Sequence, residues 1–171
     1  SILRNAVATP VSLATISSDS EEITYFTPRL SGFQLRVSHT PENCEGAAAP
    51  CAGTIAAGRR SEIIEIGANY IGKVGGIDMS LHAGIAKGEL GLAAPGAENQ
   101  DRWDLGVELR FAGFTFGADY RQDDQGAALP NTDRIDYSLG LAYVTGNWTI
   151  AAAYAHGEVE AGAGLGLDET D

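Results

Sequence analysis

The side chains best suited to chemistry in this sequence are three histidines, at positions 39, 82 and 156. Their spacing matches no metal-binding motif, and none stands in a sequence arrangement of nucleophile and base. His82 falls on the polar face of a predicted strand, and His156 lies at a strand end. We therefore predict no catalytic residue, no metal site and no cofactor.

Two cysteines, Cys44 and Cys51, lie close together in one predicted loop. In an oxidising compartment such neighbours usually pair, and closing so short a loop contributes about 2.5 kcal/mol in the chain-entropy model. Two free thiols are the alternative, and a metal site would need further Cys or His ligands that the loop lacks. We predict a disulfide.

The other reactive groups are carboxylates and guanidinium groups, which alternate with apolar residues over long stretches. In residues 103–121 every second position is apolar, and the positions between them are polar, charged or glycine. A turn at residues 112 and 113 places Phe111 opposite Phe114 and Asp104 beside Arg121, so that each cross-strand pair shares a face. This period of two predicts a β-hairpin.

Three further hairpins follow from the same pattern, over residues 22–39, 64–85 and 135–156. In the last of these, a turn at Thr145-Gly146 places Tyr143 opposite Trp148. The predicted fold is an all-β, antiparallel up-and-down meander of about eight strands.

Composition narrows the class of protein further. With 171 residues the chain is long enough for one domain. A net charge of -12 without a basic stripe argues against nucleic acid as a partner. Charged residues or glycine interrupt every apolar stretch, which excludes a helical membrane protein.

The connections between the predicted strands alternate between short turns and long links, the latter at residues 40–60, 88–100 and 122–133. Transmembrane β-barrels show this asymmetry, and strands of 9 to 12 residues suit a tilted crossing of a bilayer. The aromatic residues gather near both strand ends, roughly 20 Å apart in height, as in an aromatic girdle, although ordinary core aromatics are the alternative. The girdle comprises Tyr70, Phe111, Phe114, Tyr143 and Trp148 near the short turns, and Trp103, Tyr120, Tyr137 and Tyr154 near the long links.

Residues 23–35 resemble the general diffusion porins of Gram-negative bacteria, particularly the alphaproteobacterial type. The motif that carries the resemblance is Tyr25-Phe26-Thr27-Pro28 followed by Gly32-Phe33. The segments that begin the second strand of two hairpins, residues 113–117 and 146–149, resemble the same family. Arg36 and His39 depart from the pattern, because the family tends to have glycine and an aromatic residue there.

The resemblance implies an outer-membrane barrel of about 16 strands that assembles as a homotrimer, in contact with membrane lipid, so that this chain would be an internal fragment. Residues 1–20 would be a polar loop, either the tail of the inward-folded loop that constricts such pores or an exposed surface loop. Residues 21–157 would form a partial barrel with four hairpins, and residues 158–171 the start of a truncated external loop.

The polar face of the meander predicts a water-filled channel for passive diffusion of small hydrophilic solutes and ions, because its small residues leave space only in a wide barrel. Trp103, Leu105, Phe116, Leu141 and Ile150 are expected on the convex face, and Glu65, Asp119 and Ser138 on the concave face. The predicted pore-lining residues are Arg36, Glu65, Asp78, His82, Asp104, Glu108, Arg110, Asp119, Arg121 and Asp136.

These charges number about six acids to three arginines, which predicts moderate cation preference. Asp104 is expected to pair with Arg121, so that Glu108 and Asp119 carry most of the unpaired field. Two other functions remain possible interpretations of the sequence. One is a non-conducting outer-membrane anchor or adhesion barrel of eight strands with functional external loops, and the other is a soluble ligand-binding barrel.

Overall fold

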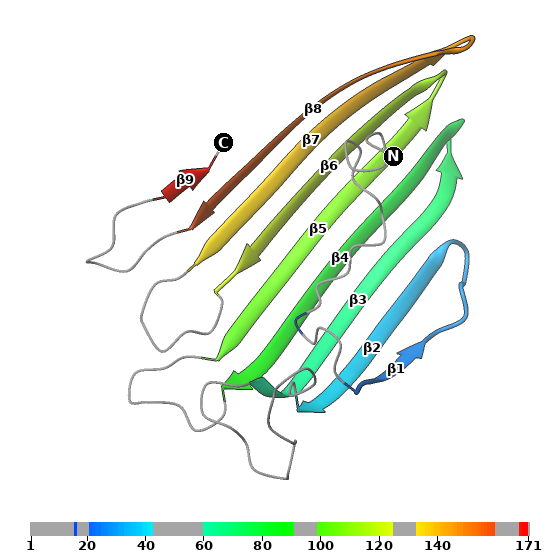
Figure 1. The fold of residues 1–171 in the computed structure, drawn as a ribbon. Helices are drawn as coiled ribbons and strands as arrows, with labels where there is room; N and C mark the ends of the chain where they lie inside the picture. The colour runs from blue at the N-terminus through cyan, green and yellow to red at the C-terminus, as the bar shows by residue number, and fades with distance from the viewer. Residues whose placement is uncertain are drawn as a thin grey trace.

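The fold is a single sheet of antiparallel strands, seen in a computed structural model that describes residues 16, 21–42, 60–90, 99–124, 133–159 and 168–170 (Figure 1). The strands are β1 (Ile23–Phe26), β2 (Phe33–Glu42), β3 (Arg60–Val74), β4 (Ile77–Leu90), β5 (Gln100–Phe111), β6 (Phe114–Asp123), β7 (Arg134–Thr145), β8 (Trp148–Val159) and β9 (Asp168–Thr170).

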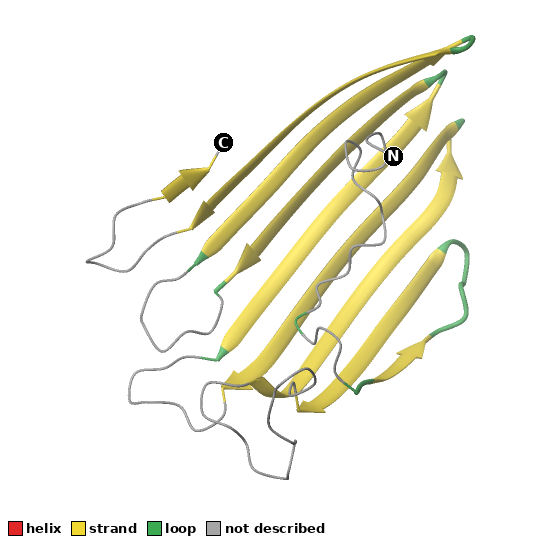
Figure 2. Ribbon diagram, in the orientation of Figure 1, coloured by secondary structure: helices red, strands yellow, loops and turns green. Residues whose placement is uncertain are grey.

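The strands follow one another across the sheet in chain order, each pairing antiparallel with its sequence neighbours. This confirms the all-β meander, with strands β1 to β8 in the predicted hairpins. The three-residue β9, paired with the end of β8, was not predicted. Figure 2 shows strands joined by turns and loops. In the described part of the chain no helix has the length and apolar character needed to span a membrane.

Alternation along the strands gives the sheet two chemically different faces. In β4, Leu81 and Ile85 are exposed on one face, whereas His82 and Ala86 are buried on the other. We call the exposed apolar face the outer face and the more polar one the inner face. Phe116 is 40% exposed, and the other four residues expected on the convex face are likewise exposed. The apolar residues therefore do not form a core between two layers.

The register of the β5–β6 hairpin is the predicted one, with Phe111 opposite Phe114 and Asp104 opposite Arg121. The β7–β8 register is different from the prediction. Tyr143 lies opposite Ile150 rather than Trp148, because the turn consists of Gly146 and residue 147.

Gly146 has a φ of 57°, so the glycine stands first in the turn, as a type II′ hairpin requires. The prediction from the sequence placed Gly146 second in the turn, after Thr145. The observed pairing of β7 with β8 therefore differs from the predicted pairing by two positions. Because side chains alternate with a period of two, each one still lies on its predicted face.

Gly32, in the turn before β2, supports a specific prediction about stability. Its φ is +93°, and a Cβ there would lie 2.6 Å from the carbonyl oxygen of Ile71 and 2.7 Å from the Tyr70 ring. We expect Gly32→Ala to lower the free energy of unfolding by about 2 kcal/mol, since it adds a steric clash to backbone strain.

Gly75→Ala is the matched control, because Gly75 also has a positive φ, of +57°, but nothing lies within 4 Å of its added Cβ. Denaturant unfolding of both variants in detergent micelles checks the prediction. Equal destabilisation would show that the contact with Tyr70 and Ile71 contributes nothing.

Candidate functional site

All of the predicted pore-lining residues lie on the inner face. The strand registers place them there because residues directly opposite one another share a face. They come from β2 to β7: Arg36, Glu65, Asp78, His82, Asp104, Glu108, Arg110, Asp119, Arg121 and Asp136.

The inner face also carries charges that the sequence analysis missed. Arg102 and Arg134 fall one residue outside the predicted hairpins, but β5 and β7 include them and the alternation continues through them. Lys73 was counted with a turn, whereas β3 extends to Val74. The additional inner-face charges are Glu22, Arg60, Lys73, Arg102, Asp123 and Arg134. Among the described side chains, these additions bring the positive and negative charges of the inner face close to balance.

A β-bulge brings Arg60 to the inner face. The register between β3 and β4 shifts between Ser61 and Ile64, and Glu62 adopts a φ of 48°. Strict alternation from Ile64 and Ile66 would have placed Arg60 on the outer face. The extra residue reverses the phase of the strand, so that Arg60 lies opposite Leu90 and lines an inner-face cavity.

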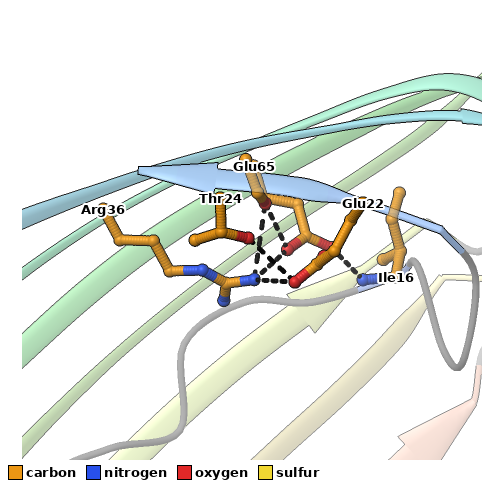
Figure 3. A network of polar contacts seen from close by, with 6 residues as sticks. Ile16, Glu22, Thr24, Arg36 and Glu65 are labelled. Carbon is orange, nitrogen blue, oxygen red and sulfur yellow. Dashed lines mark hydrogen bonds and ion pairs between the residues drawn. The ribbon is translucent and has the colours of Figure 1, made fainter. Parts of the chain in front are cut away.

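Glu65 is the centre of a buried polar cluster on the inner face. Its Oε2 accepts hydrogen bonds from Arg36 Nη2 at 3.0 Å and from Ser38 Oγ at 3.1 Å. Its Oε1 accepts the backbone N–H of Ile16 at 2.8 Å. Arg36 Nη2 also lies 3.4 Å from Glu22 Oε1, so that one guanidinium joins two carboxylates (Figure 3).

Ile16 also has an apolar contact site on this polar face. With Ile63 and Ala86 it forms a small cluster of buried hydrophobic side chains. The absence of a side chain at Gly88 makes room, because a Cβ there would lie 3.0 Å from Ile16 Cδ1. Residue 16 is therefore held against the inner face by both its backbone and its side chain.

Arg121 does not pair with Asp104 as the sequence analysis expected, although the two lie directly opposite one another. Its Nε donates to Asp136 Oδ2 at 2.9 Å, across the next pair of strands, and its Nη2 also contacts that oxygen. Asp136 also accepts Arg134 Nε, at 2.8 Å to Oδ2. A Cβ at Gly157 would lie 2.7 Å from Asp136 Oδ1, so that this glycine makes room for the carboxylate.

Four arginines gather around one cavity at the long-link end of the inner face. The cavity has a volume of about 350 Å³, and we call it the arginine pocket. Gln100 Nε2, on its wall, donates to Asp123 Oδ1 at 2.5 Å. The pocket is lined by Ile16, Arg60, Gln100, Arg102, Arg121, Asp123 and Arg134, which come from β3, β5, β6, β7 and the segment before β1.

The middle of the inner face holds the acids with fewest partners. Asp104 is 5% exposed and lies 3.9 Å from His82 Nε2, and it interacts electrostatically with Arg102 and Arg121 without direct contact. Asp119 accepts a hydrogen bond from Ser138. Within the described ranges, neither carboxylate forms an ion pair with arginine or lysine. Glu108, expected to be unpaired, instead contacts Arg110 Nη2 at 2.5 Å.

The predicted girdle residues all lie on the outer face, and several form ring pairs across strands. Near the long links, the Trp103 and Tyr120 ring centroids are 5.0 Å apart. Near the short turns, Phe114 stacks on Tyr143 at 4.3 Å. The remaining girdle residues are Tyr70, Phe111, Tyr137, Trp148 and Tyr154. Their contact with lipid remains a prediction, and the predicted disulfide between Cys44 and Cys51 falls outside the described residues.

The sheet has an exposed apolar outer face, charges and small residues on its inner face, and two levels of aromatic side chains. This is the pattern of a transmembrane barrel wall. No curated protein and no solved structure matches the chain. The family model described as Gram-negative porin matches residues 3–170. The chain therefore belongs to the Gram-negative porins and is a protein of the bacterial outer membrane.

Proposed function

We propose that the chain forms part of the wall of a water-filled channel through which small hydrophilic solutes and ions diffuse. The observation that carries this proposal is the composition of the inner face. Between its charged residues stand Gly67, Gly84, Gly106, Gly117 and Gly140. Such small residues cannot fill a narrow eight-stranded barrel, so the wall suits a wider barrel of about 16 strands, as in the general diffusion porins.

We further propose that residues 1–20 enter the lumen, as the tail of the loop that constricts such pores. The support is the position of Ile16, whose N–H donates to Glu65 and whose side chain packs on Ile63. The proposed homotrimer and the contact of the outer face with membrane lipid follow from the family resemblance and from the exposed apolar side chains.

The proposed ion selectivity is a moderate cation preference that arises in the middle of the wall. Asp104 and Asp119 form no direct ion pair with arginine or lysine in the described part of the chain, whereas Glu65, Glu108 and Asp136 do. We expect these two acids to contribute most of the negative potential there. Arg102 and Arg134 reduce the preference at the long-link end.

Conductance in planar bilayers tests the channel. The purified protein in potassium chloride is expected to produce stepwise current increases that persist under constant voltage. A protein that inserts into the bilayer but never carries current would contradict the channel and fit the anchor alternative instead.

The selectivity is tested by the double variant Asp104→Asn, Asp119→Asn. Its cation-to-anion permeability ratio is expected to fall by about twofold or more, since both charges lie on the channel wall. The measurement is the reversal potential in a salt gradient.

Glu62→Gln is the control, because Glu62 is exposed beside His39 and lies outside the inner face. It should leave the ratio unchanged. A double variant with the parent's ratio would show that these two acids do not set the selectivity.

A further inference from the structure

All three histidines of the sequence lie in described strands, but His82 is the one on the inner face of the sheet. His39 lies on the outer face beside Glu62, and His156 lies on the outer face against the Tyr137 ring. Histidine is the side chain whose unperturbed pKa lies between pH 5 and 8. A proton bound at His82 would therefore change the charge of the proposed channel wall near neutral pH.

The ring of His82 lies against the neighbouring strand, β5, at Gly106. A Cβ at Gly106 would lie 2.1 Å from His82 Cε1 and 2.8 Å from each ring nitrogen, so that the glycine makes room for the imidazole. In this position His82 Nε2 lies 3.9 Å from Oδ1 of Asp104, two residues before Gly106 on β5. The two side chains are 2% and 6% exposed, so that they form a buried pair.

The pair of His82 and Asp104 lacks the hydrogen bonds that buried polar atoms normally form. Among the described residues, neither carboxylate oxygen of Asp104 has a hydrogen-bond partner, and neither does His82 Nδ1. A buried carboxylate without a donor is costly, and 3.9 Å is too long for a hydrogen bond. An imidazolium has an N–H group on both nitrogens and a charge opposite to that of the carboxylate. A proton is therefore a ligand that suits this pair.

We propose that His82 and Asp104 together bind one proton from water between about pH 8 and pH 5.5, and that this proton reduces the cation preference of the channel. Two ionisable groups this close titrate as a unit. The pair therefore changes from one negative charge to none, whether the proton resides on the imidazole or on the carboxyl group. This inference rests on the proposed channel, in which Asp104 is one of the two acids expected to set the selectivity.

The charged groups around the pair are arginines, carboxylates and one lysine. From β3, the residue opposite His82 is the uncharged Asn69, and the nearest charged residues, Glu65 and Lys73, form ion pairs. Arginine stays protonated between pH 8 and pH 5.5, and an unperturbed carboxylate titrates near pH 4, below this range. We therefore expect the change of charge to arise at the pair. The charged residues nearest to it on β5 and β6 are Arg102, Glu108, Arg110, Asp119 and Arg121.

Reversal potentials of the purified protein in a potassium chloride gradient, measured from pH 8 to pH 5.5, test the inference. We expect the cation-to-anion permeability ratio to fall by about twofold over this range, because the wall loses a negative charge. The double variant His82→Gln, Asp104→Asn removes both proton acceptors, so that its ratio should not depend on pH in this range. A double variant with the pH dependence of the parent would overturn the pair.

His39→Gln is the matched control. His39 also lies beside a carboxylate, with Nε2 at 3.1 Å from Glu62 Oε2, but this second pair is on the outer face, with side chains 45% and 59% exposed. The variant should keep the pH dependence of the parent. If His39→Gln abolishes that dependence, the proton acts outside the lumen, which contradicts its assignment to His82 and Asp104.

Gly106→Ala tests the geometry of the pair without changing a titratable group. The added Cβ would displace the His82 ring from its place beside Asp104. We expect the midpoint of the change in permeability ratio to move by about one pH unit, because the interaction between the two groups is altered. A midpoint equal to that of the parent would contradict the pair.

NMR titration of the protein with isotope-labelled histidine, in detergent micelles, separates the pair from conduction, and circular dichroism shows whether each variant retains its β-structure. The His82 signal is identified by its loss in His82→Gln. Its titration midpoint should move by about one pH unit in Asp104→Asn, whereas the midpoint of His39 should not move.

That result supports the pair whether or not the protein conducts. A conducting, cation-selective protein would overturn the pair and leave the proposed channel intact if its permeability ratio did not change with pH and Asp104→Asn left the His82 midpoint unmoved.

Discussion

Replacing Glu65 with alanine is expected to lower the free energy of unfolding by about 3 kcal/mol, because it breaks a buried ion pair by removing one partner. The Glu65 side chain is 2% exposed and that of Arg36 is 13% exposed. The variant leaves Arg36, Ser38 and the Ile16 N–H without their shared acceptor. The measurement is denaturant unfolding of the folded protein in detergent micelles.

Glu22→Ala is the control within the same cluster. Glu22 lies 3.4 Å from the same Arg36 nitrogen, but its side chain is 32% exposed, so that water compensates for its removal. Its loss should cost about 1 kcal/mol or less. If both variants lose the same small amount, the buried carboxylate does not anchor the cluster.

The second large effect concerns the outer face. Leu141 lies in the middle of the outer face of β7, between Tyr137 and Tyr143, and is exposed. We expect Leu141→Arg to reduce the free energy of folding into phospholipid vesicles by about 2 to 4 kcal/mol, the cost of an arginine at the midplane of a barrel's lipid face.

Ala151→Arg distinguishes lipid contact from a general intolerance of arginine. Ala151 is also exposed and lies opposite Ala142 on the inner face, one residue from the partner of Leu141. It should change the free energy by no more than about 0.5 kcal/mol. Reversible guanidinium titration in vesicles gives both values, and equal losses would argue against a bilayer around the outer face.

The faces of the strands could be predicted from the sequence because each side chain's face depends only on the period of two. The register of β5–β6 was also predicted correctly from Phe111 and Phe114. The two residues between them, Ala112 and Gly113, form the expected two-residue turn, and both have the positive φ of a type I′ turn. In β7–β8, glycine stands first in the turn instead of second. Composition alone does not distinguish these two turn types, and the predicted pairing was therefore two positions out.

The site was predicted less completely than the fold. Arg102 and Arg134 follow the predicted alternation but lie at strand ends, the least certain positions. Arg60 depends on the bulge at Glu62, which reverses the alternation and leaves no mark in the sequence pattern. Arg121 had two candidate acids, one on each neighbouring strand, and it binds Asp136, beside which Gly157 leaves space.

The chain-order pairing of the strands has a consequence for how the protein folds. Each of the strands β1 to β9 pairs only with the strands immediately before and after it in the sequence, so that the hairpins and the longer links between them set the contact order. We expect hairpins with two-residue turns, such as β5–β6, to form first and the pairings across long links to follow. Hairpins that have already formed would then pair with their neighbours one after another, and closure of the long links would be the slower step.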